Sequence, residues 1–175
     1  VLSRCLLIVS MLASAPAFAD PSPEALLRAG RVQQAWPAAR EAALAAPGDL
    51  DAQELFIDLS LTLRVVPRAL PVYRERLAQP GDEADDHYLL GRIATSVSEA
   101  EGHYRKALEL DPEHARAPMG LAAIHRARGE LDQAIARYRE ALRRDARLAE
   151  AWAGLQAAQL QKDDVAGATA TAREA

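Results

Sequence analysis

Small and apolar residues recur along this chain with the spacing of a helix face. An alanine is followed four residues later by a tyrosine in three pairs that share one phase, and these are Ala69–Tyr73, Ala100–Tyr104 and Ala134–Tyr138. Residues four apart lie on one face of a helix. The phase extends back to Ala35 and forward to Ala168, and every step is 34 residues except the 31 between Ala69 and Ala100. The pattern therefore predicts a repeated helical unit.

A second phased set predicts another helix before each of these. Large apolar residues occupy one equivalent position in four units, namely Phe56, Leu90, Leu121 and Leu155. Helix-stopping sequences also recur in phase, at 47–49, 80–82 and 111–113, and each combines proline with an aspartate that can cap the next helix. The sequence Ser98-Glu99-Ala100-Glu101 has the form of a capping box. Each unit is therefore expected to be a helix, a turn and a second helix.

These residues resemble the tetratricopeptide repeat (TPR) family, whose 34-residue unit places Trp, Leu, Gly, Tyr, Ala and Pro at fixed offsets. The resemblance covers nearly all of the chain after residue 19. It implies an all-α fold, a right-handed solenoid of about four to five helix–turn–helix hairpins. The repeats are expected at about 20–49, 50–83, 84–114, 115–148 and 149–175.

The first nineteen residues have a different character. Arg4 precedes an apolar run from Cys5 to Ala13, and Ala17-Phe18-Ala19 has the small-x-small form of a cleavage site. We interpret residues 1–19 as a signal peptide cut after Ala19, which predicts a periplasmic or secreted protein. Retention of this segment as a membrane anchor remains an alternative.

Composition narrows the class of protein. Half of the residues are hydrophobic, 26% are charged, and the single cysteine lies in the apolar run. These values indicate a globular chain and exclude collagen-like, disulfide-rich and disordered classes. The 39 alanines suit closely packed helices. A formal net charge of −4 argues against a nucleic-acid partner.

No pattern typical of catalysis or metal binding is found. The four histidines, His87, His103, His114 and His125, have no histidine or motif carboxylate at metal-ligand spacing. No serine lies in a nucleophile elbow, and no glycine-rich loop could hold a phosphate. The sequence thus predicts no enzyme, no cofactor, no metal site and no small-molecule substrate.

The family resemblance implies where a partner would bind. In TPR proteins the first helix of each hairpin lines a concave groove, and ligand contacts come from one stripe of that helix. Transferred to this chain, the stripe includes Asp51, Glu54, Asp58, Tyr88, Arg92, Arg116, Met119 and Arg126. The three arginines are expected to form a basic strip that binds an acidic segment of another protein. Reversal of Arg92 and Arg116 to glutamate is expected to weaken that binding and leave folding intact.

The function predicted from these observations is an exported scaffold that binds a partner peptide or helix in the groove and assists assembly of an envelope complex, which includes a possible membrane-associated complex. Two other classes stay open. The chain can be a structural subunit that oligomerises without a groove ligand, or an accessory domain of a larger enzyme that continues past residue 175. The sequence does not indicate the oligomeric state.

Overall fold

The computed structural model describes residues 21–78 and 83–175, and these residues form ten α-helices. The predicted signal peptide, its cleavage site after Ala19 and the helix stop at 80–82 lie outside the described residues. The helices are α1 (Pro23–Arg28), α2 (Val32–Ala45), α3 (Leu50–Thr62), α4 (Val66–Leu77), α5 (Glu83–Ile93), α6 (Val97–Leu110), α7 (Arg116–Ala127), α8 (Leu131–Arg144), α9 (Ala149–Gln161) and α10 (Val165–Glu174). None of them is long and apolar enough to cross a bilayer.

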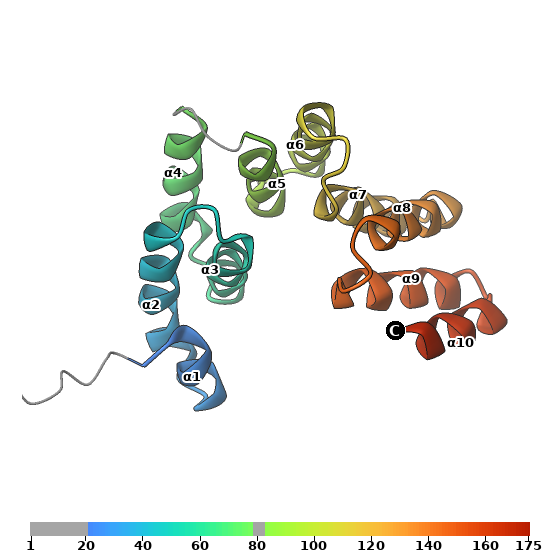
Figure 1. Ribbon diagram of the computed structural model, residues 1–175, viewed down its shortest axis with the longest axis horizontal. Helices are drawn as coiled ribbons and strands as arrows, with labels where there is room; N and C mark the ends of the chain where they lie inside the picture. Colours follow the sequence, from blue (N-terminus) through green and yellow to red (C-terminus); the bar gives the residue numbers. More distant parts are fainter. Residues whose placement is uncertain (1–20, 79–82) are drawn as a thin grey trace, which may run out of the picture.

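The helices form an arch of successive hairpins (Figure 1). Each helix packs on the next one in the chain, and first helices also contact each other, as α3 does with α5, α5 with α7, and α7 with α9. Helices α3, α5, α7 and α9 therefore line the inner side of the arch, and α4, α6, α8 and α10 lie outside them (Figure 1). The expected all-α helical-repeat solenoid is confirmed.

The turn within a hairpin has the same backbone conformation in four of the five hairpins. One residue of each turn has a positive φ, between 57° and 78°, and these residues are Gly30, Arg64, Gly129 and Asp163. Among the described residues, the α5–α6 hairpin lacks this feature. It is the unit with the 31-residue step, and α5 ends at Ile93, three positions before the residue equivalent to the end of α3. The first helix of this unit, α5, consequently has 11 residues, compared with 13 in α3.

Helix α6 is capped by Ser96, not by Ser98 as the sequence predicted. The N-cap is Ser96, whose hydroxyl accepts a hydrogen bond from the Glu99 backbone N–H at 3.2 Å. The Glu99 carboxylate in turn accepts from the backbone N–H of Thr95 at 3.1 Å. The helix thus begins two residues earlier than the box proposed at Ser98, because Ser96 has the extended backbone that a cap requires.

Tyrosines of second helices pack directly against glycines of first helices. The ring of Tyr104 on α6 lies between Gly91 of α5 and Gly120 of α7, where an added Cβ would stand 2.6 and 2.5 Å from ring carbons. Tyr138 on α8 lies against Gly154 of α9 in the same way. Because no Cβ separates the ring from the helix backbone, the phased tyrosines hold consecutive hairpins in close contact.

The Gly120→Ala variant is expected to lower the free energy of unfolding by about 1–3 kcal/mol. The added methyl group would clash with the Tyr104 ring, which cannot move away because Gly91 lies against the same ring. Gly102→Ala on α6 is the matched control. Gly102 is exposed, and an added Cβ there meets nothing within 4 Å, so the control should gain about 0.5–1 kcal/mol from helix propensity. Urea unfolding followed by circular dichroism measures both, and equal effects at the two sites would contradict this packing.

Candidate partner-binding groove

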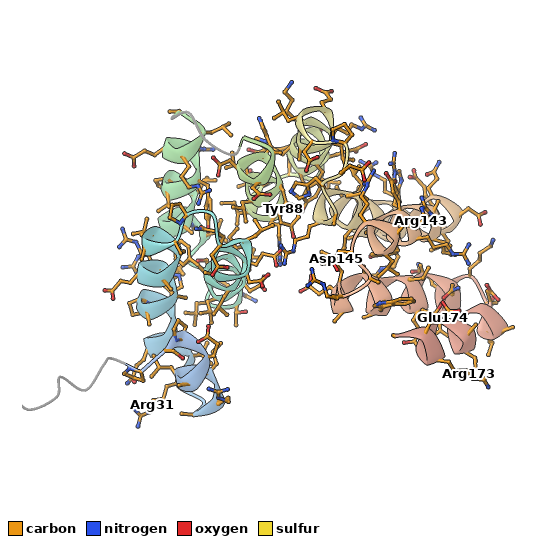
Figure 2. All side chains as sticks on the ribbon, in the orientation of Figure 1. Arg31, Tyr88, Arg143, Asp145, Arg173 and Glu174 are labelled. Atoms are coloured by element: carbon orange, nitrogen blue, oxygen red, sulfur yellow. The ribbon has the colours of Figure 1, made fainter. Side chains whose placement is uncertain are left out.

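The eight stripe residues lie on three inner helices. Asp51, Glu54 and Asp58 are on α3, Tyr88 and Arg92 are on α5, and Arg116, Met119 and Arg126 are on α7. Figure 2 shows Tyr88 where α5 faces the inside of the arch. Six of the eight join in one set of contacts, described below, while Met119 and Arg126 take no part in it.

Carboxylates of α3 bind the arginines of the next two hairpins. Arg92 reaches two of them, with Nη1 3.3 Å from Glu54 Oε1 and Nη2 2.5 Å from Asp58 Oδ1. Arg116 Nε is 3.5 Å from the same Glu54 oxygen, and its Nη2 bonds to Asp51. We call these five charged residues the inner ion-pair network. It connects α3, α5 and α7, so it stabilises the stacking of three hairpins.

Tyr88 anchors the network to the hydrophobic core. Its side chain is fully buried, and its hydroxyl donates a hydrogen bond to Glu54. Burial raises the pKa of the Tyr88 phenol well above its ordinary value, and the negative charge of Glu54 adds to this effect. The hydroxyl therefore stays protonated and remains a donor to the carboxylate.

The expected basic strip is wrong in one respect, since Arg92 and Arg116 are already neutralised by α3. Their side chains are only 15% and 23% exposed, so neither is a free cation awaiting an acidic ligand. The sequence interpretation treated the acidic stripe of one repeat and the basic stripe of the next as separate surfaces. The curvature of the arch instead brings oppositely charged side chains together.

Arg126 and Met119 make no ion pair with the network. Arg126 is in the last turn of α7, and its buried Nε has no hydrogen-bond partner within the described part of the chain. Ten residues separate it from Arg116, which corresponds to about 15 Å along the helix axis. Met119 lines a cavity of about 200 Å³ together with Tyr104, Ala123 and Glu150.

That cavity is an opening of the inner surface that is large enough to accept a side chain. Its wall also contains Tyr88, Arg92 and Tyr138, so it combines aromatic surface with one cation and one anion. A larger cavity of about 470 Å³ lies elsewhere, lined by α8, α9 and α10. Arg143 and Glu174, two of its lining residues, are labelled in Figure 2 on the outer helices α8 and α10. A binding test must therefore distinguish the two cavities.

Two histidine contacts escaped the search for metal-ligand spacing. His87 of α5 and His103 of α6 bring their Nδ1 atoms within 2.9 Å of each other. His114, buried just before α7, accepts a hydrogen bond from the Ala117 backbone N–H at 3.0 Å, and its Nε2 is 3.0 Å from Asp85. Spacing along the chain could not reveal the His87–His103 or His114–Asp85 contact, because the partners are 16 and 29 positions apart. Within the described ranges, no three His, Cys, Asp or Glu residues are grouped to hold a metal ion.

Arg92→Glu is expected to lower the free energy of unfolding by about 2–4 kcal/mol, because it places a third carboxylate beside Glu54 and Asp58 in a partly buried position. This outcome differs from the sequence-based expectation of intact folding. Arg139→Glu on α8 is the control, since Arg139 is exposed and should change stability by less than about 0.5 kcal/mol. Chemical denaturation of both variants decides the matter, and an unaffected Arg92→Glu protein would disprove a structural role for the network.

Comparison with known proteins supports the fold. Residues 94–158 match the sequence model of the tetratricopeptide repeat family. This region runs from the α5–α6 turn to the last turns of α9, and it contains both glycine-packed tyrosines. A search of curated protein sequences gives no significant match.

Several solved structures align with most of this chain at low sequence identity. A thermophilic TPR protein of Thermus thermophilus aligns with a TM-score of 0.65 and 20% identity, covering 85% of this chain and 84% of its own. MamA aligns at 0.54 and 17%, covering 87% and 91%. YrrB, described as a TPR protein with an unusual peptide-binding site, aligns at 0.51 and 15%, covering 87% and 80%. Residues 94–158 therefore match the tetratricopeptide repeat family, and the described chain has a helical-repeat fold similar to that of a TPR protein.

Proposed function

We propose that this protein is a non-catalytic scaffold that binds a segment of a partner protein on the inner surface of the arch. The observation that carries the proposal is the cavity beside Met119, which opens next to charged side chains from three different hairpins. A pocket with apolar walls and a few convergent polar groups is typical of a binding site. The groups around it offer contacts rather than nucleophiles or metal ligands.

The similar folds favour a protein partner. YrrB is described as having a peptide-binding site, and it shares the helical-repeat fold of this chain. Stacked hairpins create extended concave surfaces that suit a peptide or a helix. A segment that spans several hairpins would bury more surface than a small molecule, and its ends would extend along the arch.

The proposal includes export. The apolar run and the Ala17-Phe18-Ala19 sequence support removal of residues 1–19, which would place the scaffold in the periplasm or outside the cell. A partner in that compartment would belong to an envelope complex, whether soluble or associated with the membrane. The role proposed here is to assist the assembly of such a complex.

Blocking the inner cavity tests the proposal. Ala123 lines it and is exposed, so Ala123→Trp should fill the cavity without disturbing the core. Ala170→Trp is the matched control, because Ala170 is an exposed alanine that lines the larger cavity of α8, α9 and α10. A partner captured from an envelope fraction by the wild-type protein is purified, and its Kd for all three proteins is measured by isothermal titration calorimetry.

We expect Ala123→Trp to weaken binding at least tenfold and Ala170→Trp to leave the Kd unchanged. The opposite result would move the binding site to the outer helices. Loss of affinity in neither variant, accompanied by concentration-dependent self-association in light scattering, would favour the oligomerising subunit instead.

A further inference from the structure

The inner surface holds more negative than positive charge. Three carboxylates of α3 face two guanidinium groups in the inner ion-pair network. Glu150 at the start of α9 adds a fourth carboxylate, and its charge acts on both Arg92 and Asp58. The network and Glu150 together therefore contain four carboxylates and two guanidinium groups, of which Arg92 and Glu150 line the cavity.

Neighbouring arginines do not correct this imbalance. Arg147 lies near enough to interact with Asp51, but Asp145 binds it through Nε and Nη2 at 3.0 and 3.2 Å. Arg126 lies one turn beyond Ala123 on α7, but among the described residues no ion pair joins it to Asp58 or Glu150. Arg92 is thus a cation that these two carboxylates share.

The anions concerned are accessible to a ligand. The Asp58 side chain is 45% exposed although it touches Arg92, and Glu150 is exposed. Burial raises the pKa of Asp58, and the negative charges of Glu150 and Glu54 raise it further against the opposing effect of Arg92. A carboxyl group with a raised pKa gains from an additional positive charge nearby. The exposed carboxylates of Asp58 and Glu150 are therefore open to a cationic group of a ligand.

The cavity determines what lies next to that cation. Glu150 is part of its wall, together with the apolar surface of Met119, Ala123 and Tyr104. A side chain that enters the cavity meets apolar atoms, whereas its neighbour along the ligand would lie near Glu150 in the wall and near Asp58, which binds the wall residue Arg92. A guanidinium or ammonium group there would pair with both carboxylates.

We propose that the inner surface selects a protein segment in which an arginine or lysine adjoins an apolar residue, with the apolar side chain in the cavity and the cation between Asp58 and Glu150. This inference rests on the proposed function and names the chemistry of the partner. It reverses the acidic segment expected from sequence, because the arginines of the stripe already have partners within the chain.

Selection from a random library of 12-residue peptides tests the proposal without a known ligand. The wild-type protein is immobilised, and the enriched peptides are sequenced and titrated by fluorescence anisotropy. Two double variants with the same change in net charge are compared. Asp58→Asn with Glu150→Gln removes the proposed cation site, while Glu109→Gln with Asp132→Asn removes two exposed carboxylates of the outer helices α6 and α8.

We expect enrichment of peptides with Arg or Lys beside an apolar residue. Their affinity should fall at least tenfold in the first double variant, stay within twofold in the second, and decrease as salt is raised. Cationic peptides that bind both double variants equally would overturn the inference, since attraction by the overall charge would then suffice.

The Ala123→Trp variant separates the two proposals. Enriched peptides that are acidic or neutral, and that lose affinity in Ala123→Trp, would overturn the cation site and leave the groove function standing. If no enriched peptide is sensitive to Ala123→Trp, both the groove function and this inference are wrong.

Discussion

The contact between a tyrosine ring and a glycine on a neighbouring helix controls the geometry of this molecule. Tyr104 touches Gly91 and Gly120 directly, and Tyr138 touches Gly154. A side chain larger than hydrogen at these glycines would push the helices apart. In the first hairpins, aromatic rings pack against each other instead. The Phe56 ring centroid is 5.5 Å from that of Trp36 and 6.2 Å from that of Tyr73. Close approach of first helices follows from these contacts.

That close approach explains the charged inner surface. Arg116 can reach Asp51, 65 positions earlier in the chain, only because the hairpins between them stack tightly and curve. The ion pairs in turn connect α3 to α5 and α7, and the fully buried Tyr88 links them to the core. Packing, curvature and electrostatics are consequently coupled. A substitution at a glycine that contacts a tyrosine ring would alter the distances among the carboxylates. The binding chemistry proposed for the arch therefore depends on residues that no ligand would touch.

The sequence predicted the fold well for a physical reason. Each repeat packs in the same way, so the same residue type recurs at the same position of every unit. The shared phase of Tyr73, Tyr104 and Tyr138 therefore indicates the repeat without knowledge of any contact. The predicted stripe residues lie on the first helices α3, α5 and α7, but Tyr88 is fully buried, so it is not an exposed contact of the groove. The resemblance did not predict that Arg92 would pair with Asp58, because partners 34 residues apart depend on the pitch of the solenoid. The His87–His103 contact was not predicted either, because the two residues lie on different helices of one hairpin.

On the inner surface, carboxylates from distant repeats share one electrostatic environment. The pKa of Asp58, measured by carbon-13 NMR titration in the wild-type protein and in Glu150→Gln, reports on this environment. We expect a wild-type pKa above the ordinary aspartate value of about 3.9, raised by burial and by the charge of Glu150, and a lower value in the variant. An Asp58 pKa at or below the ordinary value, unchanged by Glu150→Gln, would contradict both the curvature and the negative excess described above.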